Sequence, residues 1–230
     1  MKVNFLLDET KNSYNIWDTV NDSVSYGYDF SKNIDPKLYK IAKDKTFKEC
    51  KDKIIEANKS LAISLTALFL AKDINRAWQM IEQEYVRRME KMTGKPFCSD
   101  DIKGYLTTID RCPYNSKDKT FMINAFAGVF YNLKTAGHEI FHLQFHEYFF
   151  DEMEKQLGNA DTHYLKEALT VLLNIEFRDL WFVEDKGYKD HKSLREFIIK
   201  EWISVEKDFQ KLLNSCVVYI LDEGRNRKYK

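Results

Sequence analysis

The chain has 230 residues, of which 44% are hydrophobic and 14% aromatic, and this content is ample for a buried core in one large domain or two small ones. Lysine and arginine together number 36, and so do aspartate and glutamate. Because the formal net charge is zero, no global field favours nucleic acid or an acidic membrane surface, and we expect no nucleic-acid partner.

The four cysteines are widely spaced and form no C-x-x-C pair (Cys50, Cys98, Cys112, Cys216). This spacing indicates neither a zinc knuckle nor a dense disulfide framework, so a reducing compartment is the simpler assignment. The most apolar window, residues 61–71, is much shorter than the roughly 20 residues that a membrane span needs. We therefore expect a cytoplasmic protein without a membrane span.

In chain order, residues 2–30 are expected to form short strands or extended segments, because apolar residues alternate over 3–7. Helical character begins at Pro36, which suits a first helical turn. Three helices are expected over 36–93, and Gly94 is a stop signal at their end.

A short β section follows. Residues 105–110 and 120–126 are rich in β-forming residues and are separated by turn residues at 113–116, so they predict an antiparallel hairpin. Three further helices are expected, over 131–157, 162–182 and 192–221.

These elements predict a predominantly helical α+β fold with a small antiparallel sheet, whose edge strand 120–126 precedes the helix 131–157. No repeat or low-complexity linker marks a boundary, so we expect one domain, 1–230, with two lobes. The first lobe, about 1–95, holds the extended segment and three helices, and the second, about 96–230, holds the hairpin and the remaining helices.

An H-E-x-x-H motif, His138 to His142, lies within the expected helix 131–157. Residues four apart on a helix share one face and lie about 6 Å apart along the axis, so both imidazoles can bind one metal ion. Glu139 falls on the neighbouring edge of the helix. It can hold a water molecule at the metal without being a ligand, as hydrolysis near neutral pH requires.

A catalytic zinc usually has three protein ligands and one open position for water, so a further ligand is needed. His146 repeats the spacing of four, but it lies about 12 Å along the axis from His138, too far to share an ion with it on an unbroken helix. Glu176 is one candidate, because it lies in line with an apolar stripe where a carboxylate needs a partner. His163 is another, either as a ligand or as support for one.

Residues 164–170 read Tyr-Leu-Lys-Glu-Ala-Leu-Thr on the next expected helix. With H-E-x-x-H upstream, they resemble the gluzincin group of zincin metallopeptidases, many of which carry W-x-x-E-G-L-A at this place. The resemblance implies a zincin-like domain that binds Zn²⁺, with Glu167 as the third ligand. The small neighbours of Glu167 would let two helices approach closely enough to share one ion.

A second resemblance lies in Asn124-Ala125-Phe126-Ala127. Thermolysin-like gluzincins carry an N-A-F segment on the strand that borders the cleft. The resemblance implies that Asn124 and Ala125 bind the substrate backbone, with the peptide added to an open sheet edge.

The resemblance therefore implies a zinc metallopeptidase that cleaves a peptide or protein substrate. Glu139 would act as the general base that takes a proton from the activated water and later passes it to the leaving amine. A donor to the tetrahedral oxyanion is also expected, and the candidates are Tyr188, His191 and His163. The sequence does not predict an oligomeric state.

Two alternatives remain open. The chain can instead be a zincin-like binding or regulatory protein that keeps the metal without turnover. A helical-bundle carboxylate metalloprotein is less favoured, because that architecture needs a second E-x-x-H and the sequence has none.

Overall fold

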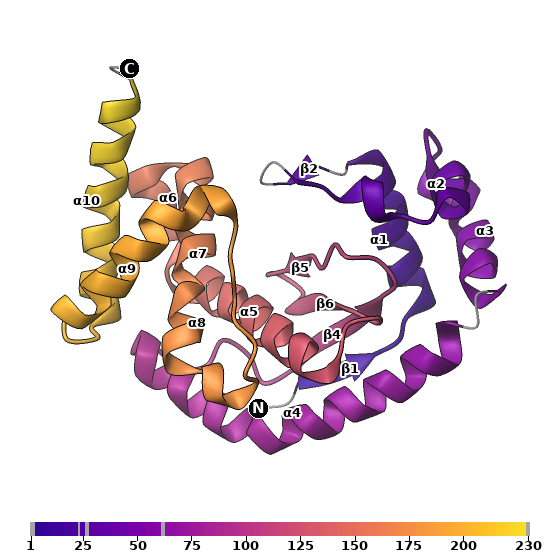
Figure 1. Cartoon of the computed structure of the whole chain (residues 1–230), viewed down its shortest axis with the longest axis horizontal. Coiled ribbons are helices and arrows are strands. Elements are labelled where there is room, and N and C mark those ends of the chain that lie inside the picture. The colour runs from indigo at the N-terminus through magenta and orange to yellow at the C-terminus, as the bar shows by residue number, and fades with distance from the viewer. Residues whose placement is uncertain (1–2, 23, 26–27, 61–62, 229–230) are drawn as a thin grey trace. The chain divides into compact units, whose positions relative to one another are not determined.

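The computed structural model describes residues 3–22, 24–25, 28–60 and 63–228. The chain divides into two compact units. The sheet unit consists of Lys2–Met80 and Asp101–Ala136, and the helical unit consists of Ile81–Asp100 and Gly137–Lys230. Figure 1 labels the elements of both units in chain order.

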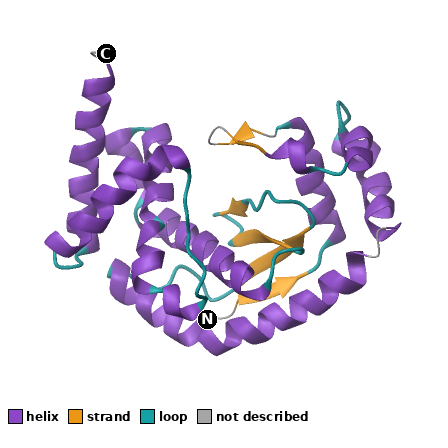
Figure 2. Cartoon of the chain, viewed as in Figure 1, coloured by secondary structure: helices purple, strands orange, loops and turns teal. Residues whose placement is uncertain are grey.

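A four-stranded mixed sheet belongs to the sheet unit (Figure 2). Its strands, in spatial order, are β1 (Val3–Leu6), β4 (Ile102–Thr107), β6 (Thr120–Asn124) and β5 (Tyr114–Asn115). β1 pairs with β4 and β4 with β6 in parallel, whereas β5 pairs with β6 in the antiparallel sense. The α+β class is confirmed, but the sheet is not purely antiparallel.

The predicted hairpin of 105–110 with 120–126 is wrong, because β4 and β6 run parallel. The chain reverses between β5 and β6 instead. There Oδ1 of Asn115 accepts hydrogen bonds from the backbone N–H groups of Lys117 and Asp118 at 2.9 and 3.0 Å. An Asn side chain that binds the backbone in this way stabilises a turn, and here the turn directly follows β5. The outermost strand on this side is therefore β5, and the prediction that 120–126 forms the edge strand is wrong.

Helix α1 (Glu9–Asn21) occupies much of the segment 2–30, so the expectation of extended structure is wrong there. Asp8 caps its first turn. Its buried face is partly polar, and Asn15 donates a hydrogen bond to Oγ1 of Thr107 at 2.9 Å. A polar buried face hides the apolar period that would have predicted a helix. The rest of the segment contains β2 (Val24–Ser25), β3 (Tyr28–Asp29) and the 3-10 turn η1 (Phe30–Asn33).

Three helices follow, as predicted: α2 (Pro36–Ala42), α3 (Phe47–Ser60) and α4 (Ile63–Thr93). Gly94 directly follows the last of them. Positions 23, 26–27 and 61–62 fall within the predicted segments but lie outside the described residues. Part of the sheet unit's core is an apolar cluster contributed mainly by α1, α2 and α3, which includes Ile16, Val20, Leu38, Cys50 and Ile54.

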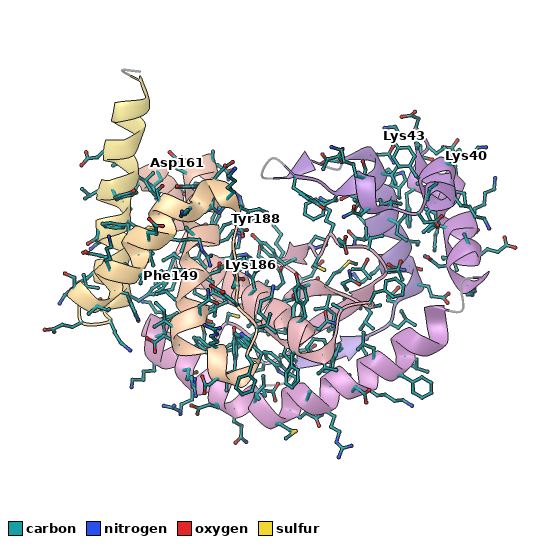
Figure 3. All side chains as sticks on the ribbon, viewed as in Figure 1. Lys40, Lys43, Phe149, Asp161, Lys186 and Tyr188 are labelled. Atoms are coloured by element: carbon teal, nitrogen blue, oxygen red, sulfur yellow. The ribbon has the colours of Figure 1, made fainter. Side chains whose placement is uncertain are left out.

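Each of the three long helices predicted for the second half is broken, and the second ends at Glu176 instead of residue 182. The observed helices are α5 (Val129–Tyr148), α6 (Phe150–Leu157), α7 (Asn159–Leu169), α8 (Val171–Glu176), α9 (Lys192–Ser204) and α10 (Phe209–Lys228). Phe149, labelled in Figure 3, separates α5 from α6. Thr170 ends α7, where its hydroxyl donates a hydrogen bond to the backbone oxygen of Glu167 at 2.7 Å. Glu206 and Lys207, both with positive φ, lie between α9 and α10.

Among the described residues, no helix combines the length and the apolar character that crossing a bilayer requires.

Gly137 precedes the H-E-x-x-H motif at a point of close packing within the helical unit. A Cβ atom there would lie 2.6 Å from Cη2 of Trp181. Its backbone oxygen accepts a hydrogen bond of 2.7 Å from the buried hydroxyl of Tyr85. The small residue before the motif therefore lets two large aromatic side chains pack directly on the helix that carries both histidines.

We predict that Gly137→Ala lowers the free energy of unfolding by about 1–3 kcal/mol, because the added methyl group overpacks against Trp181. Gly128→Ala is the matched control, since a Cβ at that position would have no neighbour within 4 Å. Urea denaturation of both variants measures the difference. A Gly137→Ala protein as stable as the control would contradict the packing described here.

Candidate metal centre

α5 supplies two imidazoles from adjacent turns. The ring centroids of His138 and His142 lie 4.4 Å apart. Ile140, Phe141 and Leu143 are buried and fix the rotation of the helix about its axis. The His142 side chain is 1% exposed and that of His138 is 16% exposed, so the pair lies almost entirely out of water.

α7 supplies the carboxylate that completes the cluster. Oε1 of Glu167 lies 3.2 Å from Nε2 of His142, and Oε2 lies 3.6 Å from Nε2 of His138. One potential ligand atom from each of the three residues lies within 4.8 Å of the others. The structure therefore brings together the two motif histidines and Glu167, and this cluster can hold a metal ion.

The donor set suits a particular group of metals. Two imidazole nitrogens and one carboxylate oxygen fit zinc and other late first-row divalent ions better than calcium or magnesium, which favour oxygen ligands only. Three protein ligands are also one fewer than a closed tetrahedral site requires.

Glu139, the predicted general base, is 8% exposed. Its charge is close enough to contribute to the environment of His138. Glu139 therefore follows a candidate ligand, His138, on the helix and is largely excluded from bulk water.

Lys166 is a neighbour that the sequence did not single out. Its side chain is 1% exposed, and Nζ lies 2.7 Å from Oε1 of Glu167. Burial alone would raise the pKa of Glu167, but the charge of Lys166 and hydrogen bonds from the two histidines hold it well below its ordinary value. The carboxylate is therefore ionised in the folded protein.

The two imidazoles have opposite protonation preferences. Burial lowers the pKa of His142 to about 3, and the charge of Lys166 adds to the effect. Burial also acts to lower the pKa of His138, but the charge and hydrogen bond of Asp185 outweigh it and raise this pKa to about 10. Near neutral pH, in the absence of metal, His142 is neutral and His138 carries a proton.

Asp185 holds the ring of His138 in place. Its Oδ2 lies 2.6 Å from Nδ1 of His138, which leaves Nε2 directed at Glu167. Asn174 accepts from the backbone N–H of Asp185 at 2.7 Å and donates to its backbone oxygen at 2.8 Å. Arg195 donates to the same oxygen at 2.5 Å, and its guanidinium lies 3.3 Å from Oδ1. Asp185 lies in an irregular segment, so no spacing in the sequence identified it.

The other candidate ligands lie in different surroundings. Oε1 of Glu176 accepts hydrogen bonds from Nε1 of Trp202 and Nζ of Lys207 at 2.9 and 2.8 Å. The His163 ring packs against Phe150, with centroids 5.1 Å apart. Neither residue belongs to the cluster that Glu167 forms with the histidines of α5.

His146 also lies outside the cluster, and its ring stacks on Phe150 at 4.2 Å.

The two remaining candidate oxyanion donors pack against each other. The ring centroids of Tyr188 and His191 lie 5.3 Å apart, and His191 is buried. Tyr188, labelled in Figure 3, lies on the irregular segment before the 3-10 turn η3 (Lys189–His191).

The predicted substrate-binding residues lie at the end of β6 in the sheet unit. Asn124 donates to Oδ1 of Asp110 at 2.8 Å and accepts from the backbone of Phe126 at 2.7 Å. Ala125 is buried, and its N–H donates to the backbone oxygen of Thr107 at 2.8 Å.

Comparisons of the chain with protein-family models, with curated proteins and with solved structures found no match.

We predict that the protein binds one zinc ion, and that His142→Ala or Glu167→Ala weakens zinc binding by at least about 100-fold. Removing a residue that only supports a ligand weakens binding by about 10–100-fold, and the loss of a ligand itself should be at least as large. His163→Ala is the control and should leave affinity nearly unchanged. Competition with a chromophoric chelator measures all four proteins. If His163→Ala lost affinity while Glu167→Ala kept it, the assignment of the third ligand would be wrong.

We also predict that zinc binding at pH 8 displaces about one proton from His138, whose pKa of about 10 keeps it protonated in the metal-free protein. His142, with a pKa of about 3, contributes none. Asp185→Asn should reduce the release, since it removes the charge that raises the pKa of His138. Calorimetry in two buffers of different ionisation enthalpy counts the protons. Equal release by both proteins would contradict the role of Asp185.

Proposed function

We propose that this protein is a zinc-dependent metallopeptidase of the gluzincin type. The observation that carries the proposal is the convergence of His138, His142 and Glu167, from two helices, with Glu139 adjacent to one of these ligands. Two neutral-nitrogen donors and one carboxylate match the ligand set of known hydrolytic zinc sites.

A bound zinc ion would supply Lewis acidity, which activates a water molecule and polarises a carbonyl group. The chain's own residues supply the rest of the reaction. Glu139 accepts the proton of the attacking water and passes it to the leaving amine. Asp185 keeps Nε2 of His138 directed at the site throughout.

Low exposure of Glu139 favours this role. A carboxylate that exchanges a proton with water in a nearly dry site is not competing with bulk solvent, and its electrostatic interactions are stronger there. We propose a peptide or protein as the substrate. That Asn124 and Ala125 bind its backbone, and that Tyr188, His191 or His163 donates to the oxyanion, stay predictions from the sequence.

The burial of the ligands also favours a second candidate function. The side chains of His142 and Glu167 are 1% and 7% exposed, and Lys166 already contacts the carboxylate. A site this closed suits a protein that holds a metal for structural or regulatory purposes and does not turn over. Turnover itself distinguishes the two candidates.

The decisive variant is Glu139→Gln. It should retain stoichiometric zinc and lose peptide hydrolysis by about 10²–10⁴-fold, because the amide cannot accept the proton of the water. Glu147→Gln is the matched control, since Glu147 is an exposed residue of the same helix. Cleavage of a mixed peptide pool is followed by mass spectrometry. Equal cleavage by both variants, or none by the zinc-loaded wild type, would contradict the peptidase.

A further inference from the structure

Lys166 is a buried charged group that the proposed reaction does not use. Lysine is almost never fully buried unless its charge is paired, and the Lys166 side chain is 1% exposed. Its partner is Oε1 of Glu167, 2.7 Å from the ammonium nitrogen. The lysine is therefore paired with the carboxylate of a candidate metal ligand.

The same carboxylate faces both histidines. Oε1 of Glu167 lies 3.2 Å from Nε2 of His142, and Oε2 lies 3.6 Å from Nε2 of His138. A zinc ion bonded to Oε1 at about 2.1 Å would lie within about 5 Å of the Lys166 ammonium in the position it occupies here. Two positive charges at that distance, almost without water, repel each other strongly.

We propose that Lys166 is the resident counter-cation of the metal-free centre, and that a divalent ion competes with its ammonium for Glu167. In the empty site the ammonium neutralises the buried carboxylate and so keeps the ligands assembled. Loading the site then requires enough free metal to overcome this competition. Lys166 thus sets the metal concentration at which the centre fills. The inference rests on the proposed metal centre, and it does not depend on peptide hydrolysis.

The opposite role for Lys166 predicts the opposite sign. If the ammonium served mainly to orient Glu167 for the metal, its removal would weaken zinc binding, as losing a hydrogen-bonding partner of a ligand does, by about 10–100-fold. A competitor, in contrast, lowers affinity while it is present. The direction of the change therefore distinguishes the two roles.

The test compares Lys166→Met with wild type in zinc titrations against a chromophoric chelator. Methionine keeps much of the length and apolar character of the lysine stem but carries no charge. We expect zinc to bind at least tenfold more tightly to Lys166→Met. Lys155→Met is the matched control, because Lys155 is exposed on α6, and it should bind zinc like wild type. Unchanged or weaker binding by Lys166→Met would overturn the proposal.

The metal-free proteins give a second, independent readout. Lys166→Met removes the ammonium that contacts Glu167 and leaves the protonated ring of His138 as the other cation there. It should therefore lower the melting temperature, and saturating zinc should remove most of the difference from wild type. The double variant Lys166→Met/Glu167→Gln lacks both charges and should melt above Lys166→Met when metal-free. If the change in melting temperature of the double variant equals the sum of the changes of Lys166→Met and Glu167→Gln alone, the two side chains are not coupled and the proposal fails.

The outcomes separate this inference from the peptidase. Tighter zinc binding by Lys166→Met, together with wild type that cleaves no peptide, would support the counter-cation and contradict the proposed function. If neither wild type nor Lys166→Met binds zinc, the metal centre is wrong and the competition proposed here is wrong with it.

Discussion

The ionised carboxylate of Glu167 is the constraint on which the helical unit depends. An isolated charge costs several kcal/mol to bury, and this one is 7% exposed. The surrounding chain offsets that cost with the ammonium of Lys166 on the same helix and the protonated ring of His138 on α5. The same convergence that compensates a buried anion also assembles three ligands that suit a divalent metal, so the stability of this region and its chemistry depend on one group.

A second set of contacts connects His138 to the irregular segment before α9. His138 is held by Asp185, and Asp185 is held in turn by Asn174 of α8 and Arg195 of α9. These helices contribute no ligand. Their part is to fix the orientation of one imidazole, since a ligand ring that can rotate binds its ion more weakly. The buried guanidinium of Arg195, which also donates to Oγ1 of Thr170 at 2.9 Å, ties that segment to the end of α7.

The sequence predicted what depends on local spacing and missed what depends on long-range pairing. H-E-x-x-H placed two histidines on one helical face because the period of a helix is fixed, and Gly94 marked the end of α4. The parallel pairing of β4 with β6 was missed, because strand-forming residues do not encode direction. Helix α1 was missed because polar side chains such as Asn15 fill its buried face. Asp185 was missed because it belongs to no motif and only the folded chain brings it to His138. Lys166 directly precedes Glu167, but it was missed because a lysine on a helix is expected to be solvated, and only the structure shows that this one is buried.

X-ray absorption spectroscopy at the zinc edge of the loaded protein tests the central claim most directly, because it reports which atoms surround the ion. The structure predicts a shell of nitrogen and oxygen at about 2.0–2.2 Å, with the scattering pattern of two imidazoles and with no sulfur. Glu167→Gln should alter the oxygen part of that shell and leave both imidazoles. A shell with one imidazole or none, or a sulfur at about 2.3 Å, would contradict a centre built from two histidines of α5 and the carboxylate of α7.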